Sequence, residues 1–155
     1  MTKAKSGAAS PLETHLGYWL RFVSNQVSHA FSRKVAALDV TVAEWVVLRE
    51  LYDGDPLVPS ALATKIGMTR GAISKITDRL TAKSLVTRTS GQHDRRFQAL
   101  ALTAKGRALV PRLAALADQN DKEFFGHLKP IERQQIERMM REIVRRHGFS
   151  AVPLD

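Results

Sequence analysis

The chain has 155 residues, of which 44% are hydrophobic and 25% charged, a composition that excludes a disordered protein and allows one domain with a buried core. It contains no cysteine, which excludes disulfides, thiolate metal sites, thiol nucleophiles and cysteine redox sensing. No apolar run approaches the ~18 residues of a membrane span and no signal-peptide pattern follows the first residues, so we expect a cytoplasmic protein.

The first long element is a helix predicted over residues 11–38, where apolar side chains recur every three or four positions. Residues 1–10, which precede it, are expected to form a disordered tail, and residues 11–155 a single domain. Thr41 and Glu44 have the spacing of a capping box, in which two side chains bond the free amides at the start of a helix. They predict where a second helix begins.

Two short helices follow, at residues 60–66 and 69–83. Gly67 is a residue that commonly ends a helix, and Thr69 is one that commonly caps the start of the next. The apolar residues of the second of these helices share one face. They are Ile73, Ile76 and Leu80. Two helices joined by so short a turn have the layout of a helix-turn-helix.

A β-hairpin is predicted next, with strands at residues 85–89 and 97–102 and a charged, turn-rich segment between them. Thr103 then caps a long helix, which Pro111 should kink because proline cannot donate the helical hydrogen bond. The last helix is predicted at residues 131–147 and is ended by a glycine.

These elements, in this order, predict a fold that is mainly α with a small β-hairpin wing. A winged helix-turn-helix core spans about residues 41–102, between long helices at about 11–38 and 103–148. The flanking helices are amphipathic, and the small core cannot cover both of them. We therefore expect them to be dimerisation helices.

The net charge of +9 is concentrated in the middle of the chain. Residues 1–59 hold six basic and six acidic side chains, residues 60–107 ten basic and two acidic, and residues 108–155 eight basic and seven acidic. The surplus thus falls on the helix-turn-helix and the hairpin. A basic surface of this kind indicates a polyanionic partner, either nucleic acid or an anionic membrane surface.

Three segments carry a resemblance to a known family. They are Thr41–Leu48, Thr69–Leu80, and Asp94–Arg96 followed by Leu102–Gly106. With these segments in this order and spacing, the chain resembles the MarR family of bacterial transcriptional regulators over about residues 12–147. It departs from the family at Ser84, where glycine usually precedes the first strand, so that a non-glycine residue must take the C-terminal position of the helix.

The second helix of the motif presents hydrogen-bond donors for base edges on the side opposite its apolar face. They are Thr69, Arg70, Ser74 and Lys75. These residues lie near the N-terminal part of the helix, where base edges are usually reached. Arg79, one turn further along, is expected to meet the DNA backbone or Asp78. The alternative is that all of them are ordinary solvent-facing side chains.

The hairpin tip carries Asp94, Arg95 and Arg96. By resemblance to the family, Arg96 would read a narrow A·T-rich minor groove, whose negative potential attracts arginine. Asp94 would then orient Arg96 through a salt bridge, and Arg95 is a further candidate for DNA contact. The alternative is a charged tip that only keeps the hairpin soluble.

The resemblance also implies a two-fold dimer of interlaced terminal helices, and a small, commonly aromatic effector bound between these helices and the winged part. The residues expected to pair the two chains are Leu12, Leu16, Ile136, Met140 and Ile143, with Phe149, Val152 and Leu154 packed on the other subunit. Trp19, Trp45 and Arg49 are the candidates for the effector pocket. A tryptophan at such a position more often belongs to the core.

Nothing in the sequence points to catalysis. The five histidines are scattered without the spacing of a metal site, so no metal is expected. No nucleophile paired with a base, phosphate-binding loop or useful pair of carboxylates occurs. We therefore expect neither an enzyme nor a cofactor.

The function expected from these observations is that of a dimeric, sequence-specific DNA-binding transcriptional regulator. It would be a repressor that a small effector releases from a pseudo-palindromic operator in double-stranded DNA. The alternative is a non-specific architectural DNA-binding protein, which would show little preference between a palindrome and random duplex. A membrane-surface protein is a third alternative, but it requires a basic amphipathic helix with large exposed apolar residues.

Overall fold

The computed structural model describes residues 9–90 and 98–150. The elements in these ranges are a 3₁₀ turn (Leu12–Thr14), α1 (Leu16–Ala36), α2 (Val42–Glu50), α3 (Pro59–Ile66), α4 (Arg70–Ala82), β1 (Val86–Ser90), β2 (Gln98–Leu102), α5 (Ala104–Phe125) and α6 (Pro130–His147). The predicted fold class is confirmed. The predicted disordered tail lies almost entirely outside the described residues.

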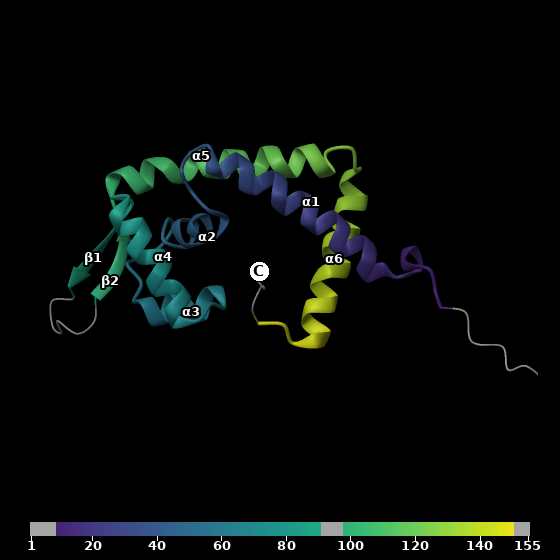
Figure 1. The fold of residues 1–155 in the computed structure, drawn as a ribbon, viewed down its shortest axis with the longest axis horizontal. Helices are drawn as coiled ribbons and strands as arrows, with labels where there is room; N and C mark the ends of the chain where they lie inside the picture. The colour runs from purple at the N-terminus through teal and green to yellow at the C-terminus, as the bar shows by residue number, and fades with distance from the viewer. Residues whose placement is uncertain (1–8, 91–97, 151–155) are drawn as a thin grey trace, which may run out of the picture.

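Helix α5 is the longest element, and the other elements are arranged along it (Figure 1). Helices α2, α3 and α4 and the β1–β2 hairpin gather at one end of α5, with α1 beside its length and α6 turning away from its other end. The molecule therefore has a winged part, which consists of α2, α3, α4 and the hairpin, and two projecting arms, which are α1 with the turn before it and α6. No helix within residues 9–90 and 98–150 is both long and apolar enough to cross a membrane.

The first helix begins later than predicted, at Leu16. Thr14 and His15 donate their amides to the carbonyls of Pro11 and Leu12 at 3.2 and 3.0 Å, which closes a 3₁₀ turn. The backbone of His15 is then extended, with φ −92° and ψ 122°, so the turn does not continue into α1. The prediction of one unbroken helix from residue 11 was therefore wrong by about one turn.

The helix-turn-helix follows the predicted pattern. The hydroxyl of Thr41 accepts from the Glu44 amide at 3.1 Å and the Glu44 carboxylate accepts from the Thr41 amide at 3.0 Å, which confirms the capping box. Gly67 has φ 78° and ends α3, and the Thr69 hydroxyl caps α4 by accepting from the Ala72 amide at 3.1 Å. These local bonds fix where α2, α3 and α4 begin and end.

Ser84 adopts the left-handed backbone conformation, with φ 59°, after the end of α4. The amide of the next residue, Leu85, bonds back to the Leu80 carbonyl at 2.9 Å, as in a helix that ends in a left-handed residue. The backbone at this position therefore requires a left-handed conformation, which serine adopts less readily than the glycine usual in the family.

The hairpin pairs β1 and β2 antiparallel, with Val86 opposite Leu102. Its strands begin one residue later than predicted, at residues 86 and 98. Leu57, between α2 and α3, exchanges both backbone hydrogen bonds with Leu100, at 3.1 and 2.7 Å. The hairpin is thereby fastened to the helix-turn-helix.

The core of the described chain lies in the winged part. Its most buried apolar side chains include Leu48, Leu62, Ile73, Leu80, Leu100 and Leu113. The predicted inner face of α4 is confirmed, because Ile73, Ile76 and Leu80 are at most 4% exposed. Among the described residues, α6 has no buried side chain, and α1 buries only Val35.

A buried polar joint fixes α1 against α5. The Asn120 side chain, 4% exposed, donates to the Val27 carbonyl at 3.2 Å and accepts from Lys34 Nζ at 3.0 Å. Lys34 also donates to Glu123 at 2.7 Å, and this hydrogen bond, with a second from Gln119, lowers the pKa of Glu123 below its ordinary value. Because Asn120 must satisfy specific partners, the two helices have one preferred register.

Candidate nucleic-acid interface

The N-terminal half of α4 presents the predicted donors to solvent. Thr69, Arg70, Ser74 and Lys75 are all exposed, on the side of α4 opposite its buried face. The Thr69 hydroxyl is used in the helix cap, whereas neither Arg70 nor Lys75 forms an ion pair within residues 9–90 and 98–150. Two cationic side chains at the amide-rich end of a helix suit a polyanion.

Arg79, one turn further along α4, lies differently from the other predicted contacts. Its Nε is 3.6 Å from Glu44 Oε1, and its side chain remains 57% exposed. Asp78, the alternative partner expected for Arg79, instead accepts from Arg88 of β1 at 2.7 Å. The Asp78–Arg88 pair links α4 to the stem of the hairpin, and no pattern in the sequence indicated it.

The predicted contacts at the hairpin tip are Asp94, Arg95 and Arg96, and all three lie outside the described residues. The stem that leads to them is described, with Thr87, Arg88 and Thr89 exposed on β1. The stem projects beside α4 (Figure 1). The described stem thus lies next to the helix that carries the other predicted contacts.

A small cavity lies beside the N-terminal half of α5, between the segment that follows α1 and the turn that joins α4 to β1. It has a volume of about 360 Å³. Its apolar lining comes from Leu38, Leu85, Ala108 and Leu109, and its polar lining from Asp39, Lys83, Lys105 and Arg112. Lys83 Nζ already donates to Glu44 at 3.0 Å and to the Asp39 carbonyl at 2.6 Å, so Lys105 and Arg112 are the cations that could face a small organic anion in this partly apolar cavity.

The three residues predicted to line an effector pocket are not brought together within this chain. The Trp45 ring lies edge-on to Phe31, with 6.4 Å between centroids, whereas Trp19 is twelve residues before Phe31 on α1, about 18 Å along the helix. Arg49 pairs with Asp53 at 2.5 Å and is exposed. Trp19 instead lines an open groove between α1 and the α5–α6 corner.

The arms expose a large apolar surface. Its members include Leu12, Leu16, Trp19, Leu20, Phe22, Ile136, Met139, Met140, Ile143 and Phe149, each at least 41% exposed. A groove of about 570 Å³ lined by α1, α5 and α6 and a hollow of about 860 Å³ against the outer side of α6 are part of it. A monomer rarely exposes so continuous an apolar surface.

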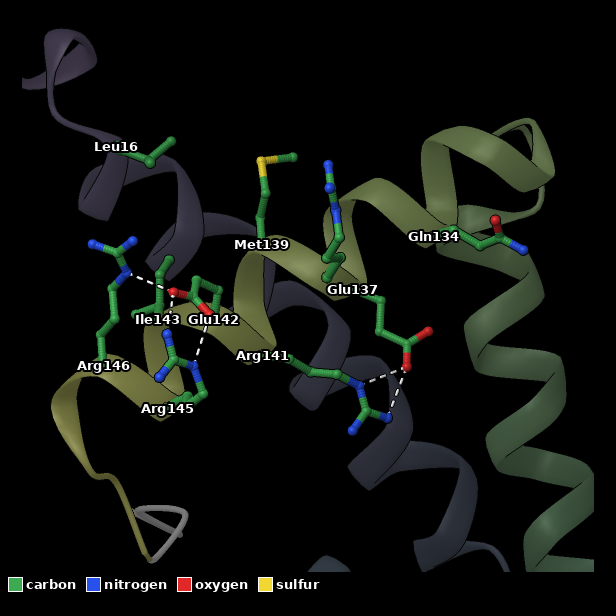
Figure 2. Close-up of a pocket in the computed structure, with 10 residues that line it drawn as sticks. Leu16, Gln134, Glu137, Met139, Arg141, Glu142, Ile143, Arg145 and Arg146 are labelled. Carbon is green, nitrogen blue, oxygen red and sulfur yellow. Dashed lines mark hydrogen bonds and ion pairs between the residues drawn. The ribbon is translucent and has the colours of Figure 1, made fainter.

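Figure 2 shows how apolar and charged side chains alternate around the hollow on α6. Met139 and Ile143 of α6 and Leu16 of α1 project near one another, while Glu142 pairs with both Arg145 and Arg146 at 2.7 and 2.6 Å. The hydrogen bonds from these two arginines, that from Arg145 first, lower the pKa of Glu142. Glu142, Arg145 and Arg146 are thus paired within α6, and the apolar side chains beside them are left exposed.

No group of three or more histidine, aspartate or glutamate side chains in the described part of the chain is placed to hold a metal ion. The long-range ion pairs were not predicted from the sequence. Glu44 lies 35 and 39 positions before its partners Arg79 and Lys83, and no spacing rule connects residues so far apart.

A sequence model of the MarR family matches residues 38–96. The HTH-type transcriptional regulator PrsX of Escherichia coli is 30% identical over 132 residues, which cover 83% of this chain and 80% of PrsX. The structure of Bordetella bronchiseptica BpsR, whose DNA binding is regulated by 6-hydroxynicotinic acid, is 26% identical, with a TM-score of 0.77 over 88% of this chain and 97% of that one.

A mutant of Escherichia coli MarR complexed with operator DNA is also similar, with a TM-score of 0.75 over 83% of this chain and 93% of that chain. Its sequence identity is 23%, so this likeness shows the fold alone.

Proposed function

Because the chain belongs to the MarR family of transcriptional regulators, we propose that it is a dimeric repressor that binds a pseudo-palindromic operator through α4 and the hairpin tip. The observation that carries this proposal is the placement of charge. Residues 60–107 hold ten basic and two acidic side chains, and the described structure gathers this segment on the winged part, with Arg70 and Lys75 exposed on α4.

The chemistry of α4 supports insertion in the major groove. Arg70, Ser74 and Lys75 offer donors for base edges, and the helix is held from behind by buried Ile73, Ile76 and Leu80. The amides of the first turn of α4, next to the Thr69 cap, suit a phosphate. Asp94, Arg95 and Arg96 at the hairpin tip are proposed to contact the adjacent minor groove.

The exposed arms support the dimer. Leu12, Leu16, Ile136, Met140 and Ile143 are 41–70% exposed in one protomer, and a second copy of the arms would remove them from water. Two copies of α4 related by a two-fold axis match a palindromic site, because half-sites repeat about every 34 Å along DNA. The dimer is therefore part of the proposed recognition.

The effector is proposed to be a small aromatic carboxylate. The cavity of about 360 Å³ combines the cationic groups of Lys105 and Arg112 with an apolar lining, as such a ligand requires. It adjoins both α4 and α5, so a ligand there can favour one placement of α4 over another. The regulation of BpsR by 6-hydroxynicotinic acid is a precedent in a similar fold. Trp19, Trp45 and Arg49 do not form such a cavity in one protomer.

The DNA-binding proposal is tested by selecting the operator from a random pool and then measuring its affinity for two variants. Lys75→Ala and Arg96→Ala are each expected to weaken operator binding by about 1–3 kcal/mol if a base contact is lost, and to lower the salt slope by about one if a phosphate contact is lost. Lys122→Ala, exposed on the far half of α5, is the matched control and should leave affinity unchanged. Operator binding by both variants with the affinity and salt slope of the parent would contradict the site assignment.

Competition with random duplex separates the proposed function from a non-specific architectural role. A sequence-specific regulator is expected to bind its operator at least about 10³-fold more tightly than random DNA. Equal competition by the two DNAs would favour the architectural alternative. Strong binding to anionic vesicles would instead favour a membrane-surface protein.

The effector proposal is tested by screening small aromatic acids for release of bound operator. In the Arg112→Ala variant, the concentration of the active acid that releases half of the DNA is expected to rise about tenfold, the size of one charge-assisted hydrogen bond. Lys122→Ala, on the same helix but away from the cavity, should respond like the parent. An active acid whose effect is unchanged in Arg112→Ala would place its site elsewhere.

A further inference from the structure

Glu44 is a carboxylate buried between α2 and α4, with a side chain only 1% exposed. Its Oε2 accepts from the Thr41 amide and from Lys83 Nζ, both at 3.0 Å. Its Oε1 is buried without a hydrogen bond among the described residues, and Arg79 Nε lies 3.6 Å from it. Glu44 therefore contacts both the start of α2 and the C-terminal end of α4.

The helix cap does not account for this arrangement. A capping box needs a single acceptor oxygen at this position, and glutamine supplies one as well as glutamate does. Burial of a negative charge is unfavourable unless cations compensate it. Both compensating cations belong to α4 or directly follow it, since Arg79 is in its last turn and Lys83 is its C-cap.

Arg79 is placed to make two contacts at once. Its guanidinium has five donors in a planar fork, of which Nε faces Glu44, and its side chain is 57% exposed. It lies on the same helix as Arg70 and Lys75, one turn beyond Lys75. A guanidinium drawn to one side by an ion pair with a buried carboxylate can present its other donors to a phosphate, with less loss of side-chain freedom on binding than an unpaired arginine.

We propose that Glu44 is a positioning residue for DNA recognition: its buried charge fixes Arg79 for a contact with a DNA phosphate and, through Arg79 and Lys83, sets the rotation of α4 in the groove. This inference rests on the proposed function, because it assumes that α4 meets DNA. Glu44 itself does not touch DNA. Its removal should therefore act through Arg79, and the effects of changing the two residues should not be independent.

The test is the Glu44→Gln variant, which keeps the acceptor for the Thr41 amide and removes only the charge. Operator affinity is expected to fall about tenfold and the salt slope to fall by about one, as for the loss of one phosphate contact. In an Arg79→Ala background, Glu44→Gln is expected to have little further effect on either quantity. Glu50→Gln is the matched control, because Glu50 is on the same helix and pairs at 2.7 Å with Lys65 of α3 rather than with α4.

A folded-state check accompanies each titration. Far-UV circular dichroism and thermal unfolding show whether Glu44→Gln is folded at the temperature of the binding assay. If it is not, the Glu44→Gln/Lys83→Met double variant replaces it, since neutralising both members of a buried pair avoids an uncompensated charge. The same losses of affinity and salt slope are expected for the double variant.

Two results would overturn the inference. One is a Glu44→Gln protein of lower thermal stability whose operator affinity and salt slope equal those of the parent, which would make Glu44 purely structural. The other is affinity losses in Glu44→Gln and Arg79→Ala that multiply in the double variant, which would make the residues independent. A parent that does not prefer its operator to random duplex contradicts the proposed function itself, and the parent titration shows this separately.

Discussion

Gly106→Ala is expected to lower the free energy of unfolding by about 1–3 kcal/mol or more, the range for forcing extra volume into a packed site. Gly106 lies in the first turn of α5, and a Cβ atom there would collide with the backbone carbonyl oxygen of Leu85. That oxygen already accepts from the Thr103 amide at 3.1 Å, and Leu85 is 3% exposed, so this backbone has little room to move.

Chemical denaturation of the variant and the parent measures this effect. Gly71→Ala is the matched control, because Gly71 is also a helical glycine but a Cβ atom added to it would have no neighbour within 4 Å. Alanine is the better helix former by about 1 kcal/mol, so Gly71→Ala should raise stability. Equal responses of the two variants would mean that α5 does not approach Leu85 closely in solution.

Ile143→Glu is expected to convert the dimer to a monomer and to reduce operator affinity by at least about 100-fold, since two linked half-sites bind far more tightly than one. Ile143 is 42% exposed on α6, between Met139 and Met140 at 54% and 47% and Val144 at 46%. A charge there costs little in a free protomer, where it remains hydrated, but would be buried in the proposed interface.

Light scattering after size exclusion should give the protomer mass of 17.2 kDa for Ile143→Glu and twice that for the parent. Gln135→Glu is the control: it adds the same charge to an exposed position of α6 that lines neither the hollow nor the groove. It is expected to leave both mass and affinity unchanged. A dimeric Ile143→Glu protein with parental affinity would show that α6 is not in the interface.

Short-range chemistry made the winged part predictable. The cap of α2 by Thr41 and Glu44, the left-handed Gly67 and the Thr69 cap each depend on residues within four positions of one another, and all three are confirmed. The left-handed Ser84 follows from the position of a helix end. The spacing of apolar residues predicted the buried face of α4, because residues three or four positions apart lie on the same side of a helix.

The start of α1 was not predictable from short-range patterns. The apolar pattern starts near Pro11, but α1 begins at Leu16, because a 3₁₀ turn closed by two backbone bonds intervenes. The periodicity of side chains does not distinguish a helix from a turn that places the same side chains on the same side.

For this protein, the sequence by itself determined the order of the elements, the ends of the helices in the helix-turn-helix and the segment that carries the positive charge, because these depend on neighbouring residues. Only the tertiary structure decided which distant groups meet. It placed Glu44 beside Arg79 and Lys83, paired Asp78 with Arg88, brought Gly106 against Leu85 and separated Trp19 from Trp45. The contacts join residues 10 to 39 positions apart in the sequence. They arise only when the helices pack, and so does the separation of the two tryptophans.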